Sequence, residues 1–188
     1  MYRSYFKRLL DILLSLTAFI FLSPLFIITA ILIKLFDPGP LIFSQMRVGR
    51  DAKEFRFFKF RSMPVNTGDI PSDKIGKVKL TWIGKLIRRT NIDELPQLYN
   101  ILIGDMSIVG PRPPIPAQKD LVEARKLNGS IGLRPGLTGL AQVNSFDGMT
   151  VSQKAEFDGI YTKNFGFLQD LKIILNTILY LFKPPPTY

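Results

Sequence analysis

The sequence predicts a mixed α/β protein (α+β, mostly helical) in which an N-terminal membrane hairpin is joined to a small basic domain. Three observations lead to this fold class: an uncharged apolar run near the N-terminus, two short strand-like segments around a glycine turn, and helical patterns in the rest of the chain. We therefore expect a re-entrant membrane helix in residues 1–36 and a basic domain in residues 37–188.

The apolar run extends from Ile12 to Ile33, 22 residues without a charge. As a straight helix it would be about 33 Å long, enough for a hydrocarbon core of about 30 Å. A secretory signal peptide is the alternative. However, its apolar region is usually only about 7 to 15 residues long, and no small-x-small cleavage site follows here. The run is therefore predicted to be a membrane segment.

Ser23 and Pro24 interrupt this run near its middle. Because Pro24 cannot donate to the carbonyl of Ile20 and crowds it, the helix should kink or break there. Both ends of the run are flanked by basic residues, which favour the cytoplasm: Arg3, Lys7 and Arg8 before it, and Lys34, Arg47, Arg50 and Lys53 after it. A re-entrant hairpin satisfies both flanks, and a kinked spanning helix is the alternative.

Composition limits the chemistry. The chain has 25 Lys and Arg against 15 Asp and Glu, a formal net charge of +10, which favours polyanionic partners: phosphorylated ligands, anionic lipid or nucleic acid. It has no cysteine and no histidine, so disulfides, thiolate chemistry and imidazole acid–base chemistry are excluded. Acid–base work must therefore fall on carboxylates.

The rest of the chain follows as a series of short elements. Residues 41–49 and 53–63 read as two strands of a hairpin, whose basic residues either bind anionic ligands or solvate a strand face. A polar loop over 65–77 precedes a helix over 82–89. The pattern over 165–182 predicts a helix that is apolar on most of its circumference and lies either in the membrane interface or in the core.

Two adjacent acids stand just before a helix in the segment "DELPQLYNILIG". Pro96 is favoured in a first helical turn, so Asp93 and Glu94 should lie at the start of a helix that runs to about Ile103 and stops at Gly104. The free amides and the dipole at a helix start stabilise negative charge and can hold a phosphate, which suits phosphoryl transfer. The alternative is that the acids merely complement the helix start.

Arg112 lies between prolines in "GPRPP". The prolines leave the backbone few conformations, so the loop can hold a planar guanidinium ready for a phosphate. A simple loop charge is the other interpretation.

Four segments then resemble, in order, the signature blocks of the bacterial sugar transferase family, the monotopic phosphoglycosyl transferases. These segments are "FSQMRVG", "FKFRSM", "DELPQLYNILIGDMSIVGPRP" and "RPGLTGLAQVN". The resemblance covers nearly the whole chain and looks like that of the small members with a single hydrophobic run.

The resemblance implies an enzyme at the cytoplasmic face of the bacterial inner membrane. Such an enzyme moves a phosphosugar from a UDP-sugar to undecaprenyl phosphate and releases UMP, the first membrane step of glycoconjugate assembly. Asp93 matches the family nucleophile, which forms a covalent phosphosugar intermediate, and Glu94 matches its catalytic partner. Mg²⁺ is the expected cofactor, with Glu94 and Asp93 as ligands. Membrane lipid and a second copy of the chain are further expected partners.

The remaining expected substrate- or phosphate-binding residues are Arg112, Lys59, Arg88, Arg134, Gln142, Asp158 and Tyr161. The sequence departs from the family pattern at Ser145-Phe146, where Gly-Arg is usual, and at Ile160, where a second Tyr is common.

Two other classes of protein also fit part of the sequence. A membrane-anchored nucleic-acid binder fits the charge, but the sequence has no helix-turn-helix, RNP or zinc pattern, so nucleic acid is not an expected partner. A non-catalytic membrane scaffold fits the apolar run but would not need Asp93, Glu94 and Arg112 together.

Overall fold

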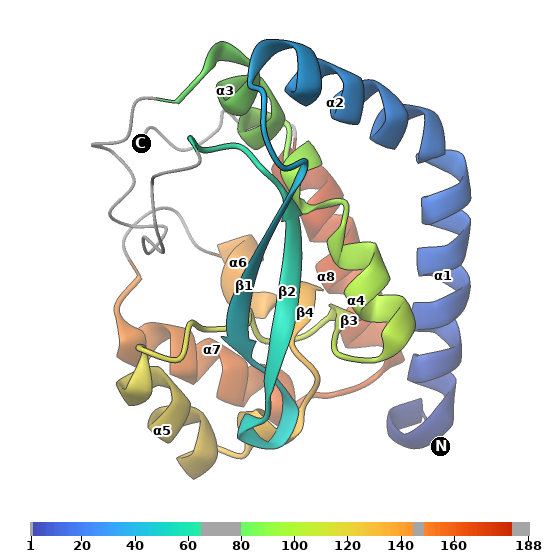
Figure 1. Cartoon of the computed structure of the whole chain (residues 1–188). Coiled ribbons are helices and arrows are strands. Elements are labelled where there is room, and N and C mark those ends of the chain that lie inside the picture. Colours follow the sequence, from blue (N-terminus) through green and yellow to red (C-terminus); the bar gives the residue numbers. More distant parts are fainter. Residues whose placement is uncertain (1, 65–79, 145–148, 182–188) are drawn as a thin grey trace.

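The computed structural model describes residues 2–64, 80–144 and 149–181. The predicted loop over 65–77 and the departure at Ser145-Phe146 lie outside the described residues. The apolar N-terminal segment forms two helices, α1 (Lys7–Phe21) and α2 (Ser23–Phe36), which follow a π-helical turn, Tyr2–Phe6. They form a long bent arm along one side and over the top of the molecule (Figure 1).

The predicted break at Ser23 and Pro24 is confirmed. α1 and α2 meet at an angle of 58°, and Pro24 lies in the first turn of α2, where its missing N–H is tolerated. The Ser23 Oγ donates to the Ile20 carbonyl at 2.7 Å, which satisfies a carbonyl freed by the break. In the described part of the chain, neither helix alone is long and apolar enough to cross a membrane, whereas the bent pair together is.

The predicted hairpin is also confirmed. β1 (Ile42–Val48) pairs antiparallel with β2 (Glu54–Phe60), with Ile42 opposite Phe60 and Val48 opposite Glu54. A short turn over Arg50–Ala52 joins them. Phe55, Phe57 and Phe60 are buried. The hairpin therefore places one face on the core and carries Lys59 toward the segment that holds the two acids.

The middle of the chain contains α3 (Trp82–Arg89), the turn Ile92–Glu94 and α4 (Gln97–Ile103). The predicted helix over 82–89 is confirmed, and so is the stop of α4, because Gly104 has φ 101°, a conformation that glycine adopts without strain. A short parallel pair, β3 (Ser107–Val109) and β4 (Gly136–Thr138), then joins two segments that the sequence does not mark as strands.

Helices form most of the C-terminal part, which lies behind and below the hairpin in Figure 1. They are α5 (Lys119–Leu127), α6 (Leu140–Asn144), α7 (Val151–Lys163) and α8 (Phe167–Leu181), with a 3-10 turn at Ser130–Gly132. In the described part of the chain, the buried apolar side chains form three groups. One lies between the hairpin and α4, one joins α2 to α3, and one joins β3 to α7 and α8.

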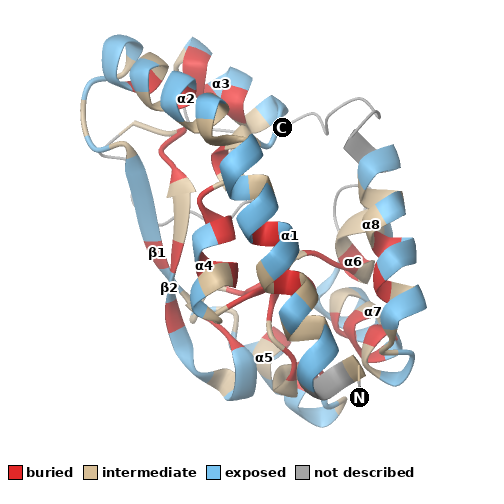
Figure 2. Ribbon diagram, turned by 90° about the vertical axis from the view of Figure 1, so that its right-hand side faces the viewer, coloured by how far each residue is buried: buried red, intermediate tan, exposed pale blue. Residues whose placement is uncertain are grey.

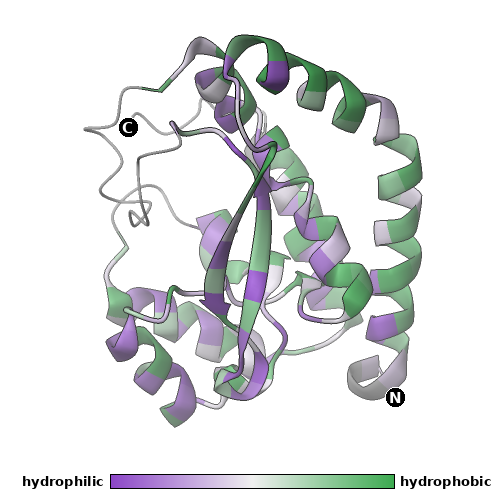
Figure 3. Cartoon of the chain, in the orientation of Figure 1, coloured by the Kyte–Doolittle hydropathy of each residue, from purple (hydrophilic) through white to green (hydrophobic). Residues whose placement is uncertain are grey.

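The outer faces of α1 and α2 are apolar and exposed (Figures 2 and 3). The buried residues of α1 are Asp11 and Ser15, and those of α2 are Thr29 and Ile33. Three of these four buried residues are polar, whereas the exposed side chains of the two helices are mostly apolar, which is the reverse of a helix on a water-soluble protein. Their exposed side chains include Leu9, Leu13, Leu16, Ile20, Phe21, Ile27, Ile28, Ile31 and Leu35.

The sequence left open whether α8 lies in the core or in the membrane interface, and the structure shows features of both positions. Asp170 and Ile173 are buried against the domain, while one face of the helix is exposed and apolar (Figure 2). The exposed apolar side chains of this face are Phe167, Leu168, Leu171, Leu175, Ile178 and Leu179, and Lys172 is exposed among them. α8 is therefore partly a core helix, and its outer face is available to an apolar medium.

Candidate active site

Asp93 and Glu94 lie in the 3-10 turn Ile92–Glu94, directly before α4, with Pro96 as the residue that caps the helix. The acids thus occupy the turn leading into α4. Asn91 enters this turn with φ 55°, a left-handed conformation that asparagine tolerates. Asp93 is only 5% exposed. The pair is therefore held on a tight, largely buried backbone.

Two cationic side chains bind the pair from different elements. The Lys59 ammonium on β2 is 2.7 Å from Glu94 Oε1 and 3.6 Å from Asp93 Oδ2. The Arg112 Nη2 is 3.2 Å from the same Glu94 oxygen, and the Arg112 side chain is 44% exposed. Arg88, in the last turn of α3, adds positive charge that acts on Asp93. The structure thus brings together five of the predicted site residues.

The two carboxylates differ in their electrostatics. Burial raises the pKa of Asp93 above its ordinary value and the neighbouring Glu94 adds to the rise, although Lys59, Arg88 and Arg112 oppose it. Burial also disfavours ionised Glu94, but Lys59 and Arg112 outweigh it and lower the pKa of Glu94 to about 2. Glu94 is therefore a fixed anion that anchors the cations. The negative charge of Asp93 is less stabilised than that of Glu94, so Asp93 loses less stabilisation when its carboxylate attacks another atom.

The loop that carries Arg112 is fixed through four consecutive carbonyl groups. The carbonyl of Pro111 accepts from the Gly136 amide at 2.9 Å, and that of Arg112 accepts from Arg125 Nη1 at 2.9 Å. The next two accept from the hairpin: Pro113 from the Arg47 side chain at 3.2 Å, and Pro114 from the Val48 amide at 2.9 Å. The predicted rigidity of this loop thus comes from these partners as well as from the prolines.

Arg125 was not predicted as a site residue, and it explains where Asp158 lies. Arg125 Nη2 is 2.7 Å from Asp158 Oδ2, and both residues are buried. Arg125 therefore bridges α7 to the backbone of Arg112. In this structure Asp158 contacts Arg125, which in turn contacts the Arg112 carbonyl. An arginine in an ordinary helix pattern gives no signal of this contact.

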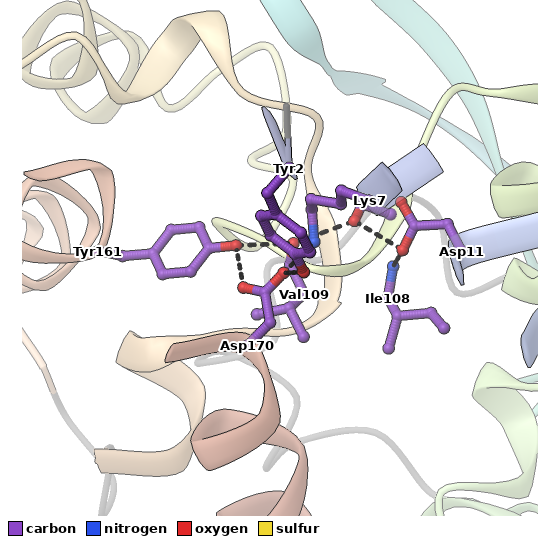
Figure 4. Close-up of polar contacts among 8 residues, drawn as sticks. Tyr2, Lys7, Asp11, Ile108, Val109, Tyr161 and Asp170 are labelled. Carbon is purple, nitrogen blue, oxygen red and sulfur yellow. Dashed lines mark hydrogen bonds and ion pairs between the residues drawn. The ribbon is translucent and has the colours of Figure 1, made fainter. Parts of the chain in front are cut away.

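Tyr161 lies in a second buried polar network, shown in Figure 4. Its hydroxyl donates to Asp170 Oδ1 at 2.7 Å and contacts the Val109 carbonyl at 3.2 Å. Asp170 Oδ2 accepts from Tyr2 and from Lys7, both at 2.6 Å. This network joins α7 and α8 to the start of the N-terminal arm.

Asp11 attaches α1 to β3 in the same region (Figure 4). Its Oδ1 accepts from Ser107 Oγ at 3.1 Å and from the Ile108 amide at 3.0 Å. The apolar arm is therefore held to the strand that leads into the Arg112 loop. In the sequence, Asp11 stands out only as a lone acid directly before the apolar run, a position that does not identify its partner.

The other two predicted residues lie elsewhere. The Arg134 Nε donates to the Gly104 carbonyl at the end of α4 opposite to Asp93. Gln142 in α6 is partly buried, and its side-chain amide finds no hydrogen-bond partner among the described residues.

A magnesium ion would have two carboxylates available here. Within the described ranges, no group of three or more Asp, Glu, His or Cys side chains could form a complete protein cage. Mg²⁺ usually binds through one or two carboxylates plus substrate phosphates and water, so Asp93 and Glu94 fit this ion. The Lys59 ammonium already lies against both carboxylates, so a bound ion would share them with Lys59.

Comparison with known proteins identifies the class. A family model described as bacterial sugar transferase matches residues 2–184, and the chain belongs to this family. It is 38% identical over 187 residues to the UDP-glucose:undecaprenyl-phosphate glucose-1-phosphate transferase of Klebsiella pneumoniae, covering 92% of this chain and 39% of the relative.

Two other relatives are similarly close. The chain is 40% identical over 185 residues to the UDP-N-acetylgalactosamine-undecaprenyl-phosphate N-acetylgalactosaminephosphotransferase of Aeromonas hydrophila, covering 93% of this chain and 43% of the relative. It is 39% identical over 189 residues to the exopolysaccharide production protein PSS of Rhizobium leguminosarum bv. phaseoli, covering 92% and 93%. The chain thus spans about two fifths of the first two relatives and most of the third.

Proposed function

We propose that this chain is a phosphoglycosyl transferase that moves a phosphosugar from a UDP-sugar to undecaprenyl phosphate and releases UMP. The observation that carries the proposal is the buried Asp93 next to an anchored Glu94, with Lys59 and Arg112 converging on the pair. The names of the first two relatives support the substrate classes, and the name of the third supports a place in polysaccharide assembly.

The proposed reaction has two displacements at one phosphorus atom. In the first, an Asp93 carboxylate oxygen forms a bond to the phosphorus that bears the sugar, and the bond from that phosphorus to the UMP oxygen breaks. In the second, a phosphate oxygen of undecaprenyl phosphate attacks the same phosphorus and the Asp93 carboxylate leaves. The two steps let a soluble donor and a membrane-bound acceptor react in turn at the same site.

The neighbouring residues have separate roles in this scheme. Arg112 and Lys59 stabilise the negative charge of the phosphate oxygens in each transition state, and Arg88 adds to this field near Asp93. Glu94 keeps Lys59 and Arg112 in place, because both bind its Oε1. Asp93 and Glu94 would hold Mg²⁺ together with the donor pyrophosphate. When bound, the ion would neutralise the charge of the departing UMP.

The apolar outer faces of α1, α2 and α8 support a position in the cytoplasmic face of the bacterial inner membrane. α1 turns Asp11 and Ser15 toward the protein and leucines outward, which suits a helix in lipid. The bend of 58° at Pro24 lets the arm enter and leave the same side of the bilayer as a re-entrant hairpin. The chain would then be monotopic, with α8 at the interface.

Cysteine labelling tests this topology, because the sequence has no native cysteine. We expect Ser4→Cys and Pro40→Cys, one on each side of the arm, to resist a membrane-impermeant maleimide in intact cells and to react after lysis. Labelling of Ser4→Cys alone in intact cells would mean that the arm spans the membrane. Replacing Ser23 and Pro24 by Ala and Leu should straighten the arm and shift some molecules toward that state.

Arg112→Lys tests the need for a planar fork. The lysine keeps the charge but cannot contact a phosphate through two parallel N–H groups, so we expect UMP release to fall by about tenfold or more. Steady-state rates at saturating UDP-sugar are the measurement. Activity within about twofold of wild type would show that a point charge is sufficient at this position.

Asp158→Asn tests the bridge to the Arg112 loop. The substitution weakens a buried ion pair and should cost about 3 kcal/mol of stability. It should also lower UMP release at temperatures where the protein stays folded. In an Arg112→Lys background, Asp158→Asn should add little further loss of activity, because the two changes then act on one interaction. Losses that multiply would show that Asp158 supports the fold without positioning Arg112.

A UMP-release screen over UDP-sugars, with undecaprenyl phosphate in detergent or nanodiscs, tests the function itself. We expect release with at least one UDP-sugar and transfer of its phosphosugar to the lipid. A folded protein that releases no UMP with any donor would favour a non-catalytic membrane scaffold.

A further inference from the structure

A second basic site lies at the end of α4 opposite to Asp93. A cavity of about 70 Å³ opens there between the first turns of α1, the hairpin turn and the segment before β4. A single water needs only about 10 to 15 Å³ of such space, so the cavity can admit a larger group. α4 is seven residues long, about 10 Å, which separates this cavity from the proposed reaction.

Four cationic side chains from three separate segments line this cavity: Lys7 and Arg8 of α1, Arg50 of the hairpin turn, and Arg134. Asp11 is the one acidic residue in the lining, and its Oδ1 already accepts from Ser107 and Ile108. Burial, together with the charges of Arg8 and Arg50, lowers the pKa of Arg134. The cations are therefore close enough to repel one another.

Structural roles account for part of this cluster. Arg8 donates to the carbonyls of Ile101 and Leu102, and Arg134 to that of Gly104, so both cap the C-terminal end of α4, where cations are favoured. Lys7 pairs with Asp170. Among the residues that the structure describes, Arg50 caps no helix; its side chain is 54% exposed and its ion pair is with the adjacent Asp51 at 3.3 Å. Arg50 is thus the cation whose place at the cavity these contacts explain least.

We propose that this cavity binds a phosphate-bearing anion, held by Arg50 with Arg8 and Arg134. Guanidinium groups bind phosphate oxygens through paired N–H donors, and an anion here would relieve the repulsion among the cations. The anion is either the headgroup phosphate of a membrane lipid or a soluble phosphate. The lipid headgroup as the source of the anion rests on the membrane position in the proposed function. The binding of a phosphate by these side chains does not depend on that position.

The position of the cavity suits a headgroup. The exposed apolar face of α1 begins at Leu9, directly after Lys7 and Arg8. That of α8 begins at Phe167, two residues after Phe165, which lines the cavity. Both apolar faces therefore start beside the cavity, which would lie at the level where basic side chains meet lipid phosphates.

Phosphate titration by NMR tests the site directly. In the full-length, ¹⁵N-labelled protein in zwitterionic micelles, inorganic phosphate should shift the amides of Ser107, Gly132 and Leu133 saturably. Arg50→Gln should weaken this binding by about fivefold or more. Lys126→Gln is the matched control, because Lys126 is 47% exposed and likewise pairs with a nearby acid, Glu123, so it should leave the titration unchanged.

Vesicle binding separates the two sources. On phosphatidylcholine vesicles with added phosphatidylglycerol, a headgroup site predicts that Arg50→Gln lowers retention by about fivefold, well beyond the loss with Lys126→Gln. Phosphate shifts without this difference would assign the site to a soluble anion. Two results together would overturn the proposal. The first is equal retention of the two variants on vesicles. The second is a phosphate titration that shows either no saturable shift or a shift that Arg50→Gln does not change.

The result can be separated from the proposed transfer. Asp93→Asn should keep the phosphate shifts at the cavity while losing UMP release. If phosphate does not bind at the cavity, wild-type protein should still release UMP. If the protein does not catalyse the transfer, phosphate should still shift the amides at the cavity.

Discussion

Asp93→Asn is expected to lower UMP release by about 10³-fold or more, the largest effect of any single change in this chain. Asparagine keeps the shape of the side chain but removes the negative charge and most of the nucleophilicity. Asp93 is only 5% exposed and pairs with Lys59 at 3.6 Å, so the substitution also removes a buried charge without leaving a void. The measurement is the steady-state rate of UMP release, with thermal unfolding to show that the variant is folded.

A matched control separates this effect from the loss of any carboxylate. Asp120→Asn changes an exposed acid in the first turn of α5, and it should leave the rate within about twofold of wild type. A folded Asp93→Asn protein that retains about a tenth or more of the activity would rule out Asp93 as the nucleophile.

Removal of divalent metal is expected to have the second largest effect. EDTA should lower UMP release by about 100-fold or more, and added Mg²⁺ should restore it. The reason is that the described residues offer only the two carboxylates of the proposed site and no metal cage of their own, so the ion would depend on free Mg²⁺ in solution.

Thermal unfolding in EDTA provides the control, because the fold has no structural need for the ion among the described residues. Unfolding should therefore be unchanged while activity is lost. Full activity in the chelator would contradict the proposed metal role.

Local signals predicted much of the fold. Pro24 breaks the arm because its backbone nitrogen has no proton, and Gly104 ends α4 because its backbone adopts a positive φ. The hairpin follows from apolar and polar residues that alternate on either side of a glycine turn. Each of these features depends on residues close together in the sequence, which is why the sequence alone could indicate them.

Contacts between distant segments could not be predicted in this way. Asp11 accepts from Ser107 Oγ across 96 positions, and Arg125 of α5 donates to the Arg112 carbonyl in the loop after β3. The parallel pairing of β3 with β4 has three residues on each strand, too short for a periodic pattern. Such contacts depend on how the elements pack, and a lone acid or arginine carries no local sign of its partner.

The proposed site was likewise predictable from the sequence only in part. The acids, the Arg112 loop and Lys59 were expected together from motifs and from the family resemblance. The structure adds that Glu94 Oε1 is the common partner of Lys59 and Arg112. It also places Asp158 and Tyr161 in buried networks that hold the Arg112 loop and β3. Spacing in the sequence could not distinguish residues that contact substrate from residues that position others.

The most direct test of the central claim is UMP release without any acceptor. If Asp93 forms a covalent phosphosugar intermediate, then mixing the enzyme with its UDP-sugar and no undecaprenyl phosphate should give a burst of about one UMP per active site. The phosphosugar should then be found by mass spectrometry on a peptide that contains Asp93, and Asp93→Asn should show neither burst nor label. UMP release that requires the acceptor from the first turnover, with no labelled peptide, would contradict the account and indicate a single displacement.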